Sequence, residues 1–208
     1  MSNLQTTTTD QPDQATAKAT GQLVFPHGVA NLTIRVDASM ASIYRGEYYG
    51  PRPRVTEAEG VISIDYPRFN PLTWGRTAAD ITVHPSVAWL VHIRDGVSRW
   101  AADLRNVDLA GIDVRGGVSR VDLQLPRPAG TVRVRVSGGA SQLRIRRPSG
   151  VAARIQIGGG ASKLALDDQG FGAVGGPVRL ESPDYSAAAD RYDIEIGGGA
   201  SKITIERE

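Results

Sequence analysis

The sequence of 208 residues predicts an all-β protein, a single-domain β-solenoid, and a short repeated phrase is the main reason. Gly-Val-Ser or Gly-Ala-Ser occurs five times. By subtraction of residue numbers, the marker serines of these copies stand 21, 22, 21 and 39 residues apart: Ser98, Ser119, Ser141, Ser162 and Ser201. A fixed period near 21 residues indicates one repeated supersecondary unit that contacts only its neighbours. No segment with helical periodicity lies between the copies.

Apolar residues recur at fixed offsets from the marker serine. Val134 and Val136 precede Ser141, Leu143 and Ile145 follow it, and mostly polar residues stand between them. The other copies repeat this alternation, which indicates a strand, a glycine corner and a second strand. We expect the corner glycines to supply backbone φ angles that other residues disfavour.

The units could pair as a meander of hairpins or stack as coils. A meander pairs the second strand of one unit with the first strand of the next, which requires no matching columns. Parallel stacking places equivalent residues about 4.8 Å apart, which explains why one residue type recurs in each column. The sequence therefore predicts a mainly parallel, β-helix-like solenoid with coils of about 21 residues and Gly-Gly-Ala-Ser corners.

The organisation along the chain follows from the same pattern. Residues 1–20 are mostly Thr, Gln, Asp and Ala, and we expect a disordered tail. The solenoid domain covers residues 21–208, in four parts: an irregular part 21–92, regular repeats 93–166, an insertion 167–190 and a final repeat 191–208. No leader or membrane-length apolar run is visible, so we expect a cytoplasmic protein, or an extracytoplasmic one if the chain is a fragment.

Three motifs carry a resemblance to a known family. They are the strands closed by Gly-Gly-Ala-Ser, the Pro-Ser-Val-Ala-Trp run at Pro85–Trp89, and the terminal Ile-Gly-Gly-Gly-Ala-Ser-Lys-Ile-Thr-Ile. Over most of its length the chain resembles the prokaryotic toastrack domains, also named putative-adhesin domains. It has a more distant likeness to the bactofilins. The resemblance implies a β-solenoid linked to cell-envelope stress or adhesion, and the likeness to bactofilins implies end-to-end assembly.

The residues argue against several kinds of chemistry. The chain has no cysteine, which excludes disulfides, thiol catalysis and cysteine–zinc sites. The glycine runs are followed by neither Lys-Ser/Thr nor a helix, so they do not predict a phosphate loop. A serine at five equivalent corners indicates a hydroxyl that caps local backbone groups rather than a nucleophile.

The histidines and acids do not suggest a metal centre. The histidines are scattered, and the acid nearest to His84 at even spacing, Asp80, would stand roughly 13 Å away along a strand. The adjacent pair Asp167–Asp168 offers too few oxygen ligands to hold calcium. We therefore predict no catalytic residue, no metal site and no cofactor, and we expect that the protein is not an enzyme.

One outward column is the strongest candidate for an interaction surface. It directly follows the marker serines and consists of Arg99, Arg120, Gln142, Lys163 and Lys202. Stacked coils would hold these cations one strand spacing apart. Either acids in another outward column, such as Asp103, compensate them, or they bind an anionic polymer, a membrane surface or a protein partner. A net charge of +2 gives no specific signal for nucleic acid.

Two further surfaces complete the sequence-based hypotheses. The chain stops three residues after Ile205 without a capping helix, so we expect an open strand edge there that favours end-to-end self-association. The predicted function is a non-catalytic scaffold for protein interaction or self-assembly. The alternative is a carbohydrate-binding or polysaccharide-active β-helix protein that uses Tyr44, Tyr48 and Tyr49. Such rings stack on sugars, but they also plug solenoid ends.

Overall fold

The computed structural model describes residues 19–67 and 76–208. The expected tail therefore lies outside the described residues up to residue 18, and Thr20 already begins the first strand. The first nine strands are β1 (Thr20–Phe25), β2 (Val29–Val36), β3 (Tyr44–Tyr49), β4 (Arg54–Ala58), β5 (Val61–Asp65), β6 (Ala78–Val83), β7 (Ala88–Ile93), β8 (Val97–Asp103) and β9 (Asp108–Val114). The other nine are β10 (Val118–Gln124), β11 (Thr131–Val136), β12 (Ala140–Arg147), β13 (Ala152–Ile157), β14 (Ala161–Leu166), β15 (Gln169–Val174), β16 (Val178–Glu181), β17 (Arg191–Ile196) and β18 (Ala200–Arg207).

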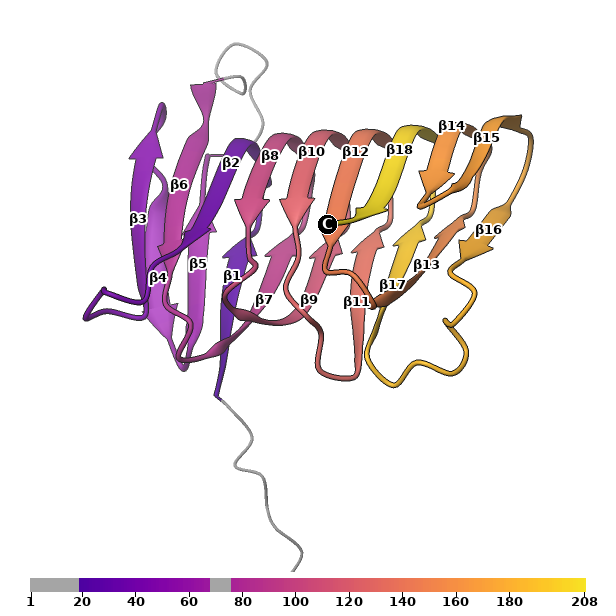
Figure 1. The fold of residues 1–208 in the computed structure, drawn as a ribbon. Helices are drawn as coiled ribbons and strands as arrows, with labels where there is room; N and C mark the ends of the chain where they lie inside the picture. Colours follow the sequence, from indigo (N-terminus) through magenta and orange to yellow (C-terminus); the bar gives the residue numbers. More distant parts are fainter. Residues whose placement is uncertain (1–18, 68–75) are drawn as a thin grey trace, which may run out of the picture.

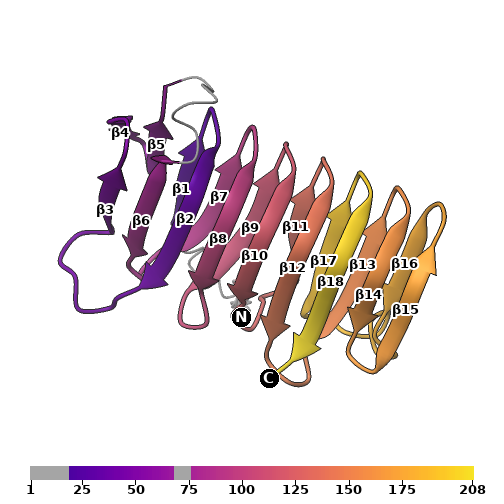
Figure 2. The same ribbon diagram turned by 90° about the horizontal axis from the view of Figure 1, so that it is seen from above.

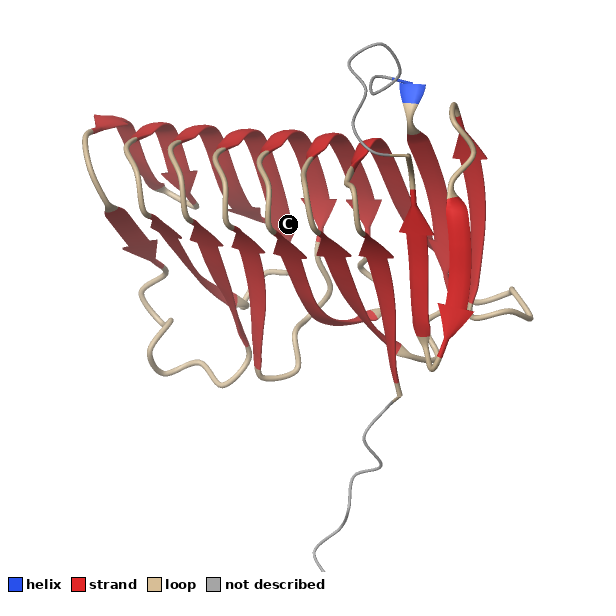
Figure 3. Ribbon diagram, turned by 180° about the vertical axis from the view of Figure 1, so that it is seen from behind, coloured by secondary structure: helices blue, strands red, loops and turns tan. Residues whose placement is uncertain are grey.

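The strands form two nine-stranded sheets that face each other (Figure 1). Sheet A has the order β16-β13-β17-β11-β9-β7-β1-β5-β4, and sheet B has the order β15-β14-β18-β12-β10-β8-β2-β6-β3. One strand of each sheet at the same level forms a rung. Strands carry nearly all of the regular structure (Figure 3). The predicted all-β solenoid is confirmed.

The core lies between the sheets and consists of the predicted apolar columns. Val134 and Val136 of β11 and Leu143 and Ile145 of β12 are all buried. Their equivalents in neighbouring rungs are their register partners, because each inner pair of strands is parallel. The alternation in the sequence thus places one side of each strand in the core and the other in solvent.

The corner glycines serve a different purpose from the expected one. The glycines with positive φ lie elsewhere, such as Gly60 and Gly130, so the prediction about corner φ angles is wrong. The corners instead stack so closely that a side chain would not fit. A Cβ on Gly116 would lie 1.2 Å from the carbonyl oxygen of Asp95, and one on Gly197 would lie 2.5 Å from that of Ser137. Glycine is required for close approach of backbones between rungs.

The chain does not build its rungs in sequence order. The C-terminal strands β17 and β18 lie between β11/β12 and β13/β14, as Figure 2 shows for the yellow strands. The N-terminal strands β1 and β2 are likewise inserted between β5/β6 and β7/β8. The expected open edge at the chain end near Ile205 is therefore wrong, because β18 is paired on both sides.

The true ends are antiparallel strands. At one end β3 pairs with β6 and β4 pairs with β5, and at the other β15 pairs with β14 and β16 pairs with β13. Two-residue turns connect the strands in two of these pairs. Glu59-Gly60, where both φ angles are positive, connects β4 to β5, and Asp167-Asp168 connects β14 to β15. Positive φ at such turns matches the twist of the hairpin. The segment 167–190 thus supplies the strands of the last rung.

Candidate interaction surface

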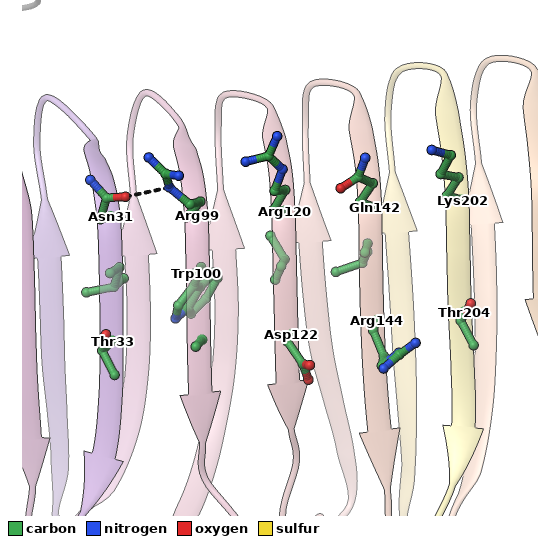
Figure 4. A pocket seen from close by; sticks show the side chains of 14 residues that line it. Asn31, Thr33, Arg99, Trp100, Arg120, Asp122, Gln142, Arg144, Lys202 and Thr204 are labelled. Atoms are coloured by element: carbon green, nitrogen blue, oxygen red, sulfur yellow. Dashed lines mark hydrogen bonds between the residues drawn. The ribbon is translucent and has the colours of Figure 1, made fainter. Parts of the chain in front are cut away.

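The predicted cationic column lies on the outer face of sheet B, and Figure 4 shows its members other than Lys163. Register places Arg99 beside Arg120, and Gln142 follows on β12. Lys202 comes next and Lys163 last, because β18 lies between β12 and β14. The structure therefore brings all the predicted cations into one row, with the last two in exchanged order.

The row continues past Arg99 toward the other end of the solenoid. Asn31 pairs with Arg99, Ala78 pairs with Asn31, and Tyr49 pairs with Ala78. The ladder row is defined as these eight residues in spatial order: Tyr49, Ala78, Asn31, Arg99, Arg120, Gln142, Lys202 and Lys163.

Local backbone geometry shapes part of the ladder row. Gln142, Lys202 and Lys163 have φ angles of 52°, 55° and 53°. A left-handed conformation at a residue other than glycine costs about 1–2 kcal/mol, and such strain is common at functional positions. In the same row, Arg99 donates from Nε to Oδ1 of Asn31 over 2.8 Å.

The charges of the ladder row are largely uncompensated. Within residues 19–67 and 76–208, Arg120, Lys202 and Lys163 form no ion pair with a carboxylate. Arg146, which stands in the column that was expected to compensate the ladder, pairs with Asp122 instead. Neighbouring cations therefore repel one another across adjacent strands, which disfavours the free state and favours an anionic ligand.

The outer face of sheet A provides the contrast. There, charges alternate in sign from strand to strand. Arg135 lies 3.7 Å from Glu195 and next to Asp113 in register, and Arg154 lies 2.6 Å from Asp193. Opposite charges thus compensate one another on sheet A, whereas Asp103, the acid expected to compensate the ladder row on sheet B, pairs with Arg105 instead.

A shallow hollow borders the ladder row along the next outward row. Its floor is open because small side chains, Thr33 and Ala101, stand where neighbouring strands carry Asp122 and Arg144. Thr204 continues the row on β18. Sequence reasoning missed this hollow. The small side chain at Ala101 was the available signal, but only the register of β2 with β8 places it beside Thr33.

The marker serines and the corner glycines border the other side of the ladder row. The marker serines Ser98, Ser119 and Ser141 line a second groove with the corner glycines. Ser162 donates from Oγ to Oγ of Ser201 over 3.1 Å, so this hydroxyl pair links two rungs. A ligand on the ladder row would contact hydroxyls on one side and the hollow on the other.

The three tyrosines do not form one exposed platform. Tyr44 and Tyr48 lie opposite Val83 and Ala79 and pack half-buried against the core at the end of the solenoid. Burial raises the pKa of the Tyr44 phenol, and hydrogen bonding with Tyr48 adds to this effect. Only Tyr49 faces outward, 50% exposed, with its hydroxyl donating to Glu47.

Titratable groups elsewhere form small pairs. In the described part of the chain, no group of three His, Cys, Asp or Glu residues is placed to hold a metal ion. His27 Nδ1 lies 2.6 Å from Asp65. Both oxygens of Asp167 accept hydrogen bonds from Arg147.

No helix among the described residues is long and apolar enough to span a membrane.

Comparison with known proteins supports the fold. No family model and no curated protein matches this chain. The crystal structure of a "putative cell adhesion protein" from Clostridium sporogenes matches with a TM-score of 0.66 and 18% sequence identity, over 92% of this chain and 94% of that one. The chain therefore shares its fold with that protein over nearly its full length. The resemblance inferred from the sequence is supported at the level of the fold.

Proposed function

We propose that this protein is a non-catalytic interaction scaffold of the adhesion type, which binds an extended anionic polymer along the ladder row. The uncompensated cations Arg120, Lys202 and Lys163 carry this proposal, since they stand in one row on the outer face of sheet B, with only Gln142 between Arg120 and Lys202. The likeness to a cell adhesion protein supports it further. Adhesion needs a rigid surface and requires no reactive group.

The geometry favours a ligand that runs along the solenoid axis. Adjacent strands lie about 4.8 Å apart, so the row offers one cation or amide at each level from Asn31 to Lys163. The guanidinium of Arg120 suits bidentate contact with a carboxylate or sulfate, and the ammonium groups of Lys202 and Lys163 act as point charges. Tyr49 ends the row with an exposed ring on which a sugar can stack. An acidic polysaccharide combines these features.

The test compares two triple variants that remove the same charge. One is Arg120→Ser/Lys163→Ser/Lys202→Ser on the ladder row. Its control is Arg115→Ser/Arg133→Ser/Arg135→Ser, which removes exposed arginines from the corner after β9 and from the outer face of β11 in sheet A. The probe is a heparin fragment, titrated by calorimetry. Each surface cation contributes about 0.5–1 kcal/mol, so the ladder variant should bind about 10- to 100-fold more weakly.

The control should stay within about threefold of the wild type, and higher salt should weaken all binding. Equal losses of affinity in both variants would mean that binding depends on the net charge of the protein and not on the ladder row. An absence of binding to the heparin fragment would contradict the polysaccharide class. Polyaspartate and phosphatidylserine vesicles, tested in parallel, distinguish a protein or membrane partner.

A further inference from the structure

The two ends of the solenoid differ in how they protect their strand edges. At the β3/β4 end, Glu57 lies opposite Ile62 and so faces inward, toward Tyr44 and Tyr48. Inward-pointing charges on edge strands are devices by which proteins prevent the pairing of such strands.

The β15/β16 end lacks these devices on β15. This strand reads Gln-Gly-Phe-Gly-Ala-Val, contains no charged residue and is exposed along almost its whole length. Phe171 pairs with Leu164, which is buried, so its ring is on the inward side at the open end of the core. Phe171 nevertheless remains 45% exposed. An uncharged edge with an exposed aromatic ring is suited to strand pairing.

The edge of β16 is complementary to itself. Arg179 and Glu181 lie on its outer side, on either side of Leu180, and their charged groups are 2.8 Å apart. If β16 paired antiparallel with a copy of itself about Leu180, each Arg179 would stand opposite Glu181 of the copy. Opposite charges placed across a strand pair stabilise it.

The strands β15 and β16 can each pair with their own copy about one common twofold axis. Leu180 lies opposite Ile155, and Phe171 lies opposite Leu164. Ile155 precedes and Leu164 follows the same corner, and each is the second buried residue counted from it. The count on β14 is one residue longer because the left-handed Lys163 is an extra outward-facing residue. A twofold axis normal to the sheets therefore passes close to both Leu180 and Phe171.

We propose that β15 and β16 pair antiparallel with the same strands of a second copy, which gives an isologous dimer. Each nine-stranded sheet then continues into that of the partner. Assembly stops at two copies, because the protected β3/β4 end does not pair. The two ladder rows come to lie on the same broad face of the dimer. This inference goes beyond the proposed function and does not depend on the ligand of the ladder row.

The experiment is light scattering on the full chain over a wide concentration range. We expect the mass to rise from 22.2 kDa to twice that value and then to stay constant. Phe171→Lys should remain monomeric. The matched control is Tyr49→Lys, which replaces a similarly exposed ring on the opposite edge strand and should dimerise like the wild type. Thermal unfolding verifies that both variants fold.

Charge exchange on β16 tests the register. Arg179→Glu should raise the dissociation constant roughly tenfold, since two like-charge contacts form per dimer. Arg179→Glu/Glu181→Arg should restore it, because the opposite charges again face each other. A wild type that stays monomeric, a mass that grows beyond the dimer, or a dimer lost in Tyr49→Lys and kept in Phe171→Lys would overturn the proposal. If the double variant failed to restore dimerisation, the proposed register of β16 with its copy about Leu180 would be wrong.

Discussion

Arg147 donates two hydrogen bonds to Asp167, from Nη1 over 2.8 Å and from Nη2 over 2.6 Å. The pair joins the end of β12 to the turn after β14, across the C-terminal strand β18 that lies between them. The Arg147 side chain is 0% exposed and that of Asp167 7%, and Arg147 Nε also donates to the carbonyl of Val151. Arg207 of β18 lies 3.2 Å from Asp167. This ion pair holds the inserted C-terminal rung in place.

Removal of the carboxylate should destabilise the fold strongly. Asp167→Asn leaves the buried guanidinium of Arg147 without its counter-charge, and the loss of one partner of a buried pair costs about 3–5 kcal/mol. The free energy of unfolding by urea measures this. The control is Asp168→Asn, since Asp168 is 99% exposed and should change stability by less than about 0.5 kcal/mol. Equal losses in the two variants would show that the pair does not clamp the rung.

Stability should also fall in acid because of the same residue. Burial opposes ionisation of Asp167, but the hydrogen bonds and charges of Arg147 and Arg207 outweigh it, so its pKa lies below the ordinary value. A lowered pKa in the folded state contributes stability above about pH 4, and this contribution is lost as the pH falls through the folded pKa. Urea unfolding between neutral pH and pH 3 should show a steeper loss in the wild type than in Asp167→Asn. Parallel curves would contradict this assignment.

Close stacking of the corners predicts a severe effect of one methyl group. In Gly116→Ala, the new Cβ would meet the carbonyl oxygen of Asp95, and the backbone of neither rung can yield cheaply. We expect a loss of at least about 3 kcal/mol, at or beyond the upper end of overpacking effects. Gly175→Ala is the control, because a Cβ added there would meet no atom within 4 Å and the φ of this glycine is not positive. Thermal melting of the two variants decides whether the corners need glycine for space.

A buried hydroxyl links a core strand to a loop. Tyr192 of β17 donates to the carbonyl oxygen of Pro126 over 2.7 Å, in a fully buried position. Tyr192→Phe should cost about 1–2 kcal/mol, since the carbonyl loses its partner without access to water. Tyr49→Phe removes an exposed hydroxyl and should cost much less. If both variants unfold at the same denaturant concentration as the wild type, the contact is not stabilising.

The sequence determines the columns but not the order of the rungs. Column membership depends only on the offset from the marker serine, so the repeat alone is enough to place Arg99 and Arg120 in one row. The interval between Ser162 and Ser201 is ambiguous, because residues 167–190 could fill a missing coil or build a further rung before the chain turns back. That choice depends on long-range pairing, which no local pattern records.

The sequence predicts the ladder row only in part, because the row also depends on pairing between strands that are distant in the chain. The cations of the ladder row share a repeat, whereas Tyr49 joins them only through the antiparallel pairing of β3 with β6. The corner glycines are recognisable by their repetition, but their purpose depends on the distance between rungs. A repeat therefore predicts which residues are equivalent, and the packing decides what they do.

The most direct test of the ladder row is a map of amide chemical-shift changes on titration with a heparin fragment. The proposal predicts changes in the first halves of β8, β10, β12, β18 and β14, which carry Arg99, Arg120, Gln142, Lys202 and Lys163. The outer face of sheet A should remain unchanged. Changes centred on β9, β11 and β17 instead, or spread evenly over both faces, would contradict the assignment of the ladder row as the binding surface.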